Sequence, residues 1–545
     1  MLRSVRSRRL AAGLLAPFFA LVLVSAVSAE VPTPTIEGPI TGPGSIFLQS
    51  TSFDLGQVGY MEEEYFISGT ASAYTPTAPL GLDGLWSVTP GDTAPYKTRI
   101  VVRRPIDAQK FNGTVVCEWL NVTLGLDAAV DWTFAHTELI RDGFAWVGVS
   151  AQYAGVEAGG AIIVSGAGQP LKTVNPGRYG SLSHPGDSFS YDMFSQAVLA
   201  IRAQSGPNVL GDLKRERVIA TGDSQAAFRL VTYIDAIHPI AQVYDGYLVH
   251  SRGVIGAPLS EAPEPAITVP GSAMIRSDLD VPVLALETET DLTSPLVGYF
   301  GARQSDSDRF RLWETAGAAH LDAYLLLTGG ADLGDSPDIV DLVVTKAPMP
   351  GTIACGVPIN SGPHHFVLNA AFAALDRWVR LGEAPEPAPR LEVAAGPPVA
   401  IVRDTNGNAL GGIRTPQVDV PIAAFTGEQS GDFLCILAGT TTPFDRAMLA
   451  QLYPSHMAFV SAYGQSLKRA VRAGWILEPD AKLMRAWAAR SGPGARCDAQ
   501  LRLLLGDHDA TLAREPAIAD VPSRALGTRQ PGGRCGLVTT RRRPH

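Results

Sequence analysis

The sequence predicts an α/β fold in which helices cover both faces of a mostly parallel central sheet. Two observations lead to this prediction. Short apolar runs without polar alternation recur between residues 97 and 317, as expected for strands that are buried on both faces. Amphipathic segments lie between these runs, and alternating strands and helices imply right-handed crossovers between parallel strands.

Each element of this fold follows from a local pattern. The runs predicted as strands cover residues 97–105, 113–121, 144–152, 217–221, 241–249, 281–287 and 309–317. Apolar residues recur near helical spacing over 131–143, 190–204, 226–239 and 366–381, which are predicted as helices. Gly143 and Pro239 are expected to end the first and third of these helices.

The N-terminus has the pattern of an export signal. Arginine occupies four of the first nine positions, ahead of a long apolar run that ends in Val27-Ser28-Ala29, a small-x-small cleavage pattern. We therefore predict a signal peptide over residues 1–29 and a secreted or periplasmic bacterial protein. An uncleaved anchor is the alternative, because residues 10–29 are just long enough to span a bilayer. Pro17 and the proline-rich segment after residue 29 favour cleavage.

Composition describes a globular chain with a sizeable core. Of its 545 residues 46% are hydrophobic and 18% are charged, enough for one large domain with insertions or for two domains. The net charge of −9 and the lack of a basic stripe argue against nucleic acid as a partner. After signal cleavage no stable membrane insertion is expected, and the sequence does not indicate an oligomeric state.

The five cysteines are few for an exported chain of this length, so the fold does not depend on a disulfide framework. Cys117 lies in the apolar run "GTVVCEWL" and is expected to be a buried, unpaired core residue. Cys355 and Cys435 lie in loop-rich stretches. We predict a disulfide between them.

A candidate nucleophile lies in "RVIATGDSQAAFRLV", residues 217–231. The segment reads as strand, turn and helix, the setting in which a G-x-S-x-G elbow exposes a serine above the sheet. Gly222 and Ala226 are small, as the sharp turn requires, although alanine replaces the second glycine. Ser224 is then the nucleophile, and the backbone N–H of Gln225 points at a developing oxyanion. The alternative is that Ser224 is an ordinary helix N-cap.

A candidate acid follows the predicted strand over 281–287. In "TETDLTSP" the carboxylate of Asp291 stands where an acid that orients a histidine belongs. Glu287 and Glu289 are nearby rivals. A run of acids is also typical of a solvated loop.

A candidate base completes the order serine, acid, histidine. His320 lies in "AGAAHLDAY", a loop of small residues that lets an imidazole reach over Ser224. His364 and His365 are the rivals. Because they begin the predicted helix over 366–381, they are expected to cap or pack its N-terminus, although one of them could line the pocket.

A second oxyanion donor is expected after the strand over 113–121. In "CEWLNVT" either the backbone N–H of Val122 or the side-chain amide of Asn121 could serve. The long connections over 153–189 and 246–280 are candidates for a lid or pocket walls.

Two polar segments suggest metal sites at first sight. "DTNGNALGGIR" begins like a calcium loop but lacks the required glycine and glutamate, so a hairpin around Asn406-Gly407 is predicted. "RYGSLSHPGDSFSYD" carries His184, Asp187 and Asp192 without tight ligand spacing, and is predicted to be a polar loop at the rim of the site. No metal or cofactor is expected.

These motifs together resemble the α/β-hydrolase superfamily. More specifically, "CEWLNVT", "AWVGVSAQ", "RYGSLSHPGDSFSYD", "TGDSQAAFRLVTYIDAIHP" and "GPHHFVLNAA" resemble a family of exported bacterial proteins called alpha/beta hydrolase domain proteins. The resemblance covers roughly residues 96–491. It implies an α/β-hydrolase fold and a serine hydrolase, most often an esterase of undetermined substrate, and Ala226 matches this family better than the lipases.

The chain is accordingly divided into four parts. We predict the signal peptide, a hydrolase domain over 30–382 with lid-like insertions, an extension over 383–491 that packs on this core, and a disordered tail over 492–545. Within the extension, short strands are expected in 399–425 and helices near 443–451, 454–473 and 479–490.

The predicted function is that of an exported serine hydrolase acting on small-molecule or polymeric carboxylic esters. Ser224 attacks the acyl carbonyl, His320 moves the proton and Asp291 fixes the tautomer of His320, through an acyl-enzyme intermediate. One alternative is a peptidase or amidase with the same three residues. Another is a secreted binding protein on a hydrolase scaffold whose serine is inert.

Overall fold

The computed structural model describes residues 31–158, 168–203, 206–394 and 396–493. The predicted signal peptide lies outside the described residues, as does almost all of the predicted tail over 492–545.

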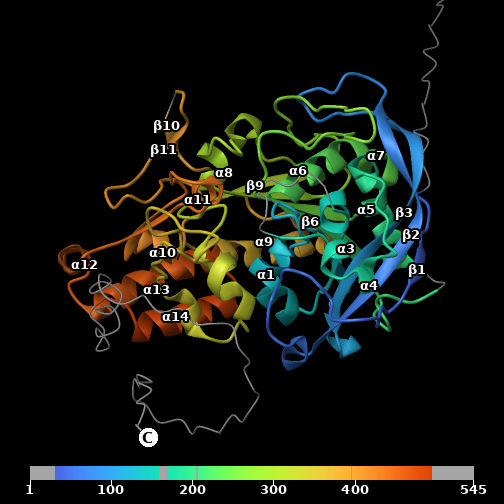
Figure 1. Cartoon of the computed structure of the whole chain (residues 1–545). Coiled ribbons are helices and arrows are strands. Elements are labelled where there is room, and N and C mark those ends of the chain that lie inside the picture. The colour runs from blue at the N-terminus through green and yellow to red at the C-terminus, as the bar shows by residue number, and fades with distance from the viewer. Residues whose placement is uncertain (1–30, 159–167, 204–205, 395, 494–545) are drawn as a thin grey trace, which may run out of the picture.

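A nine-stranded sheet forms the centre of the protein (Figure 1), in the order β1-β2-β3-β5-β4-β6-β7-β8-β9. The strands from β4 to β9 run parallel to one another, whereas β1, β2 and β3 form an antiparallel edge that joins them through the antiparallel pair of β3 and β5. The predicted mostly parallel sheet is confirmed. The strands are β1 (Thr35–Glu37), β2 (Tyr60–Pro76), β3 (Val88–Pro105), β4 (Thr114–Trp119), β5 (Ala145–Val149), β6 (Arg217–Asp223), β7 (Gly246–His250), β8 (Val283–Thr288) and β9 (Phe310–Thr315).

The seven predicted strands correspond to β3 through β9, but the sequence prediction missed β2. This strand pairs with β3 along nearly its whole length. Three successive glutamates, Glu62 to Glu64, interrupt its apolar pattern. Each of them forms an ion pair with an arginine of β3, and these partners are Arg103, Arg104 and Arg99. The charges are therefore compensated across the sheet, which the pattern of a single strand does not reveal.

Helices cover both faces of the sheet, as predicted. α1 (Val130–Arg141) and α9 (His364–Leu381) pack on one face, and α5 (Ser190–Arg202) and α6 (Gln225–Thr232) on the other. The strands supply both cores alternately: in β4, Val115 and Cys117 join the α5–α6 side while Val116 joins the α1–α9 side. Such strands are apolar on both faces, and this produced the sequence pattern.

The end of the third predicted helix was wrong. α6 continues through a π-helical turn, Tyr233–Ile237, into α7 (His238–Ala241). Pro239 lies in the first turn of α7, directly after the π-helical turn, and does not end the helix. Gly143 does follow the end of α1, with a φ of 74°.

The insertions over 153–189 and 251–282 follow β5 and β7 in the chain. The first contains α2 (Tyr153–Val156), α3 (Leu171–Val174) and α4 (Pro176–Tyr179), and the second has no helix. The predicted connection over 246–280 was too long, since its first five residues form β7.

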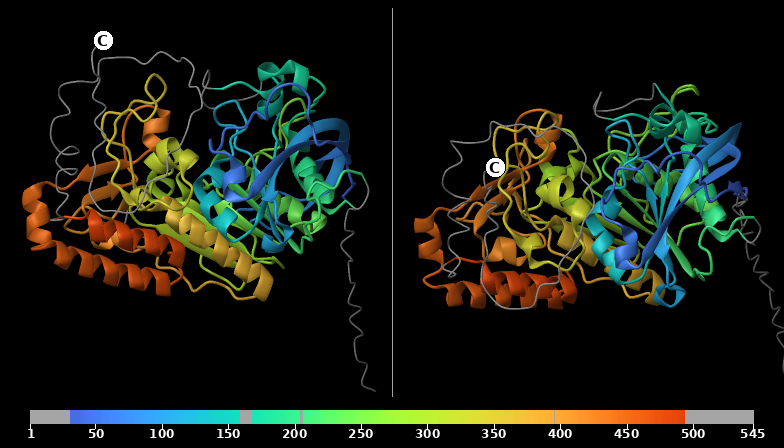
Figure 2. Two further views of the ribbon diagram at one scale, coloured as in Figure 1. Left: turned by 90° about the horizontal axis from the view of Figure 1, so that it is seen from below. Right: turned by 60° about the horizontal axis from the view of Figure 1, so that its bottom comes forward.

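The C-terminal extension lies beside the end of the sheet that is opposite to β1, β2 and β3 (Figures 1 and 2). α13 and α14 form an apolar cluster with Phe366 of α9, and an ion pair between Asp480 and Arg141 of α1 adds a polar contact. The predicted helices of the extension are confirmed. Its elements are β10 (Val393–Ala394), β11 (Ala400–Ile401), α10 (Pro416–Asp419), β12 (Ala423–Thr426), α11 (Phe433–Leu437), β13 (Thr440–Pro443), α12 (Arg446–Leu452), α13 (His456–Arg472) and α14 (Glu478–Arg490).

Both predictions on cysteines in the described residues are confirmed. Cys355 and Cys435 form a disulfide. Cys117 is unpaired and fully buried, and burial raises the pKa of its thiol to about 12.

The segment that resembled a calcium loop is a tight turn, as predicted. Asp404 binds the backbone N–H groups of Asn406 and Asn408 through its carboxylate and pairs with Arg414.

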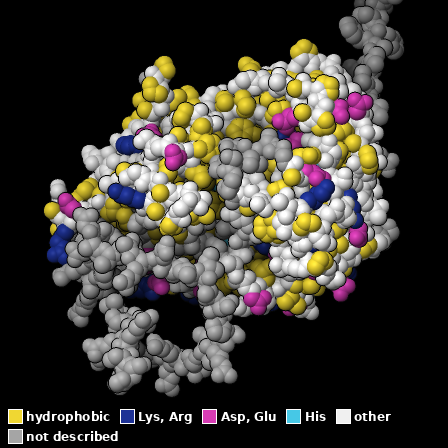
Figure 3. Space-filling view, viewed as in Figure 1, with side chains coloured by type: hydrophobic (Ala, Val, Ile, Leu, Met, Phe, Trp, Pro, Cys, Tyr) yellow, Lys and Arg dark blue, Asp and Glu magenta, His cyan; other side chains and the backbone are white. Residues whose placement is uncertain are grey.

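On the face shown in Figure 3, acidic and basic side chains are interspersed and the basic ones do not gather into a patch. Within the described part of the chain no helix has both the length and the hydropathy to cross a membrane.

Candidate active site

Ser224 occupies the sharp turn between β6 and α6. Its backbone has a φ of 56° and a ψ of −118°, a conformation that non-glycine residues rarely adopt. Ser224 N–H donates to the carbonyl of His250 at 3.0 Å, and the carbonyl of Ser224 accepts from Phe228 N–H at 3.1 Å. A Cβ on Gly222 would lie 3.2 Å from backbone atoms of Ala226, so both positions need small residues. The local sequence thus holds the serine above the end of the sheet.

The structure brings Ser224, His320 and Asp291 together. The Nε2 atom of His320 lies 2.7 Å from the Oγ atom of Ser224, and its Nδ1 atom lies 2.6 Å from Oδ1 of Asp291. With the proton on Nδ1, the imidazole donates to the carboxylate and accepts from the serine hydroxyl. His320 and Asp291 are buried and Ser224 is half-buried. This arrangement can remove a proton from the hydroxyl and stabilise the resulting imidazolium.

Asp291 is fixed from its own side by a capping box. It is the third residue of α8 (Glu289–Thr293), which directly follows β8. Its Oδ2 atom accepts from the backbone N–H of Thr288 at 2.7 Å and from the Thr288 hydroxyl at 2.8 Å. The other oxygen, Oδ1, is the one that faces His320.

The rival acids do not contact His320 through any hydrogen bond between described residues. Glu287 is fully buried, and burial, reinforced by the charge of Asp291, raises the pKa of its carboxyl well above the ordinary value. Glu289 is also fully buried and binds Gly317, Gly427 and Arg403. The alternative that this acidic run is a solvated loop was therefore wrong.

The rival histidines pack at the start of α9, as expected. The Nε2 atom of His364 lies 2.7 Å from Nε2 of His250, and burial lowers the pKa of His364 well below the ordinary value. His365 stacks on Tyr324 with ring centroids 3.7 Å apart. Among the described residues neither ring is hydrogen-bonded to Ser224, whereas His320 is.

Two of the predicted oxyanion donors differ in the hydrogen bonds that they already make. Gln225 is the first residue of α6, so its backbone N–H has no partner within the helix. The side-chain amide of Asn121 already donates to the carbonyl of Asp223 at 3.1 Å, and its Oδ1 accepts from Thr123 N–H at 2.8 Å. Asn121 therefore shapes the loop beside Ser224. Its amide group carries a second N–H hydrogen, so Asn121 and the backbone N–H of Val122 both stay candidates for the second donor.

Gln152 was not singled out from the sequence but lies beside these donors. Its side chain and that of Gln225 exchange hydrogen bonds, one of them 2.9 Å long, and it also donates to the carbonyl of Leu120 at 3.3 Å. This pair links the carboxyl ends of β4, β5 and β6. The position of Gln152 directly after the apolar run of β5 was the sequence signal that could have identified it.

A second group of buried ionisable side chains lies behind Ser224 and was also missed. His250 Nδ1 is 2.7 Å from Asp131 and 3.4 Å from Asp223. Burial and the nearby Asp131 carboxylate raise the pKa of Asp223 well above its ordinary value. The same causes raise the pKa of Glu118, whose carboxylate accepts from the N–H groups of Asp131 and Trp132 at the start of α1. A polar residue at the end of an apolar strand was the signal for Glu118, Asp223 and His250.

The polar loop over 178–192 is divided between two places. Asp187 binds Tyr153 N–H at 2.7 Å and pairs with Arg229 of α6 at 3.1 Å, and His184 lies 2.9 Å from the carbonyl of Ala151. These two residues lie near the site, as predicted. Asp192 does not, because its carboxylate binds β2 through Ser72 N–H at 2.8 Å.

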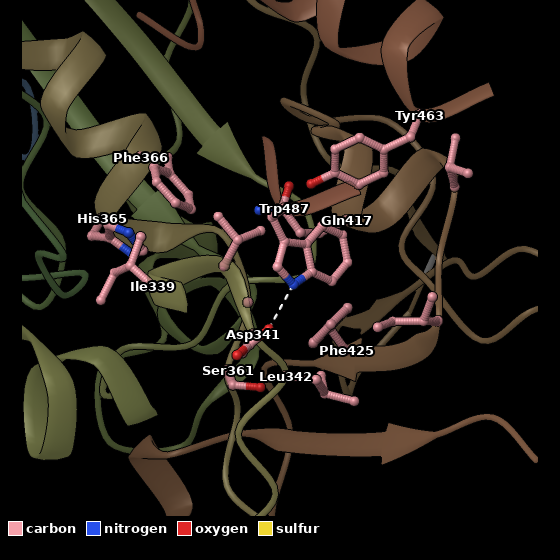
Figure 4. A pocket seen from close by; sticks show the side chains of 14 residues that line it. Ile339, Asp341, Leu342, Ser361, His365, Phe366, Gln417, Phe425, Tyr463 and Trp487 are labelled. Carbon is pink, nitrogen blue, oxygen red and sulfur yellow. Dashed lines mark hydrogen bonds between the residues drawn. The ribbon is translucent and has the colours of Figure 1, made fainter. Parts of the chain in front are cut away.

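A small cavity lies between α9 and the extension (Figure 4). It is lined by side chains that include His365, Gln417 and Tyr463, and Trp487 donates to Asp341 across it at 2.7 Å. Its free space of about 30 Å³ holds one or two water molecules. Ser224, His320 and Asp291 do not line this cavity, so it is not their substrate pocket.

The alpha/beta hydrolase domain family matches residues 31–486. No curated protein matches.

Solved structures with a similar arrangement include several hydrolases. A glucuronoyl esterase from Solibacter usitatus is 12% identical, with 52% of this chain and 81% of that chain covered and a TM-score of 0.28. Acetyl xylan esterase 1 from Thermoanaerobacterium sp. is 9% identical over 52% of this chain and 81% of that chain, with a TM-score of 0.25. Similarities this weak carry no information on substrate. The match over 31–486 is decisive for the family: the chain belongs to the alpha/beta hydrolase domain family.

Proposed function

We propose that the protein is a serine hydrolase that cleaves carboxylic esters through an acyl-enzyme intermediate. The observation that carries this proposal is the continuous contact from Ser224 Oγ to His320 Nε2 at 2.7 Å and from His320 Nδ1 to Asp291 Oδ1 at 2.6 Å. A hydroxyl, an imidazole and a carboxylate in this order form the constellation that activates a serine for acyl transfer.

The reaction follows from this order. Ser224 Oγ attacks the acyl carbon while its proton moves to His320 Nε2, and Asp291 stabilises the imidazolium. The backbone N–H groups of Gln225 and Val122 bind the negative oxygen of the tetrahedral intermediate. His320 then protonates the leaving alcohol. Water repeats the sequence on the acyl-enzyme and releases the acid.

Esters are the proposed substrates because an alcohol leaves the tetrahedral intermediate more readily than an amine does. A peptidase or amidase with the same residues is the second hypothesis and predicts a different ranking of substrates. No step requires a metal or an organic cofactor.

We also propose that the protein is exported. The basic and apolar N-terminal pattern over residues 1–29 supports this, as does the disulfide between Cys355 and Cys435, because disulfides persist in oxidising compartments. N-terminal sequencing of the protein recovered from its native compartment should begin at residue 30.

Active-site labelling tests the central proposal. Folded protein is treated with a fluorophosphonate probe, and the modified peptide is mapped by mass spectrometry. We expect one adduct, on Ser224, that heat-denatured protein does not form. Folded protein that remains unlabelled would favour a binding protein on an inert scaffold.

A substrate panel separates the two enzymatic hypotheses. Nitrophenyl esters of increasing acyl length are compared with nitroanilides of the same acids, so that only the atom of the leaving group changes. Nitrophenol is an activated leaving group that an amidase also releases quickly, so cleavage of the anilides is what decides. We expect cleavage of the esters, with the anilides cleaved no faster than by Ser224→Ala. Cleavage of the anilides above that background would assign the protein to the amidases.

A further inference from the structure

One segment of the C-terminal extension contacts both loops that carry the partners of Ser224. The hydroxyl of Thr290, next to Asp291, donates to the carbonyl of Gly427 at 2.7 Å. The backbone N–H of Leu321, next to His320, donates to the carbonyl of Leu437 at 2.9 Å. Residues 426–439, here called the rear segment, therefore lie directly behind the acid and the histidine.

The rear segment approaches these loops too closely for side chains to intervene. A Cβ on Gly427 would lie 2.3 Å from the backbone nitrogen of Thr290, and a Cβ on Gly439 would lie 2.6 Å from Cβ of Ala319. Such distances are far shorter than ordinary contacts between carbon atoms. The backbone of the extension thus sets how far the two loops can move back from Ser224.

Glu289 connects the acid loop, the histidine loop and the rear segment. Its Oε1 atom accepts from Gly317 N–H at 2.6 Å, three residues before His320. Its Oε2 atom accepts from Gly427 N–H at 3.1 Å and lies 2.9 Å from Arg403 of the extension. The carboxylate is fully buried and is held by these three groups. Burial raises its pKa, whereas Arg403 and the two N–H donors favour the charged form.

A second connection runs through Asn360. Its side-chain amide donates to the carbonyls of Gly317 and Thr426, both at 3.1 Å, and its backbone N–H donates to Ala438. Five residues earlier, Cys355 forms the disulfide with Cys435 of the rear segment. The histidine loop and the rear segment are therefore joined by hydrogen bonds that a covalent bond reinforces.

We propose that Glu289 is a positioning residue which, paired with Arg403, holds the loops of Asp291 and His320 at their working distance from Ser224. The C-terminal extension is then part of the active centre and not an appended domain. This inference rests on the proposed function. It has a physical basis because a displacement of about 1 Å between reacting groups reduces rates by roughly a hundredfold.

Two substitutions test the proposal against a matched control. Glu289→Gln and Arg403→Gln each remove the ion pair behind the site. Asp480→Asn removes another ion pair between the extension and the core. In this pair the buried Asp480 meets the partly exposed Arg141, and the pair does not touch either loop. We expect Glu289→Gln to lower kcat for a nitrophenyl ester by ten- to a hundredfold with KM within about threefold of wild type. Asp480→Asn should lower the melting temperature and leave kcat unchanged.

The rate of fluorophosphonate labelling provides a readout that a loss of stability alone does not move. It should fall with kcat in Glu289→Gln and Arg403→Gln, and Arg403→Lys should recover most of the loss because it restores the positive charge. All variants are measured at least 15 °C below their melting temperatures.

Specific outcomes would overturn the proposal. If Glu289→Gln loses stability like Asp480→Asn but keeps the wild-type kcat and labelling rate, Glu289 is only structural. If Glu289→Gln does not fold, Arg403→Gln decides, because the Arg403 side chain is partly exposed. Wild-type protein that neither labels nor cleaves esters would instead reject the proposed function, which distinguishes the two failures.

Discussion

The turn that carries Ser224 and the two loops that carry its partners are positioned in different ways. Ser224 is held by contacts within β6 and α6 and by the adjacent strand β7, which are neighbours in the core fold. The loops of Asp291 and His320 also lie at the end of the sheet, but their outer sides rest on the extension, more than 100 residues further along the chain. One half of the site is therefore built locally, and the other half is assembled from distant parts of the chain.

The two halves of the site should therefore respond differently to substitutions. Changes at the serine turn act directly on the reacting atom. Changes in the extension act through the distance between loops, so they should lower turnover by smaller factors and without altering any reacting group.

Removal of the nucleophile should have the largest effect. Ser224→Ala keeps the small side chain that the turn requires, so the fold should remain, while ester turnover falls by about five to six orders of magnitude. The measurement is single-turnover hydrolysis of a nitrophenyl ester after circular dichroism confirms folding. Near-normal turnover in this variant would remove Ser224 from the reaction.

The acid should come next. Asp291→Asn should leave His320 in the wrong tautomer and reduce turnover by about four orders of magnitude. His320→Ala should be at least as damaging. As controls, His364→Ala and His365→Ala should mainly lower stability, because these rings pack within the core. A greater loss of turnover at His364 than at His320 would mean that the base is wrongly assigned.

Gly427→Ala tests the distant half of the site. The added Cβ would meet the backbone nitrogen of Thr290, so we expect the acid loop to shift and kcat to fall by about ten- to a hundredfold. Gly464 of α13 has open space around its Cβ position, and Gly464→Ala serves as the control with unchanged kcat. Equal activity of both variants would show that the rear segment does not set the loop position.

The disulfide should contribute a smaller kinetic effect. The double variant Cys355→Ser and Cys435→Ser should lower the free energy of unfolding by about 2–4 kcal/mol. It should reduce kcat only a few-fold, since the hydrogen bonds of Asn360 to the rear segment remain. Urea unfolding and steady-state kinetics on the same preparation measure both quantities, and an unchanged free energy of unfolding would contradict the prediction.

Asp322 provides a test that concerns stability alone. Burial raises the pKa of its carboxyl from 3.8 to about 7. The folded state therefore binds more protons than the unfolded state between these values, and its stability falls as pH rises from about 4 to 7. Asp322→Asn carries no such charge, so its stability relative to wild type should increase over this range by as much as a few kcal/mol, at about 1.4 kcal/mol per pKa unit.

The control for this prediction is the exposed Asp92. Urea unfolding at pH 5 and pH 8 should show a changing difference between wild type and Asp322→Asn, and a constant difference for Asp92→Asn. A constant difference for both variants would contradict the raised pKa of Asp322.

The sequence was sufficient for the features that depend on neighbouring residues. The spacing of apolar residues along the chain predicts β3 to β9 and the helices on both faces of the sheet. Small residues at fixed spacing predict the turn that carries Ser224. Asp291 and His320 were chosen by their order along the chain and by their place after a strand. The structure places His320 beside Ser224 and Asp291 beside His320. Each of these sequence signals involves neighbouring residues only, although the contacts among Ser224, Asp291 and His320 join distant parts of the chain.

What could not be predicted depends on pairing between distant segments. The glutamates of β2 are compatible with a strand only because arginines of β3 face them. Glu289 was considered only as a rival of Asp291, since nothing near it in the sequence indicates that Gly427 and Arg403 will enclose it. Burial of a charge is decided by its partners, and two of the three partners of Glu289 lie 114 residues or more away in the chain.

The backbone of Ser224, with its φ of 56°, has a further consequence for how the protein responds to heat. A residue held in this region costs about 1–3 kcal/mol and remains there only while its surroundings enforce it. Partial loosening of β6 and α6 would let the residue relax to a negative φ and withdraw its hydroxyl from His320, although most of the sheet stayed intact. Enzymatic activity should thus decline several degrees below the global melting temperature, so inactivation curves would report the order of this one turn and not the stability of the whole molecule.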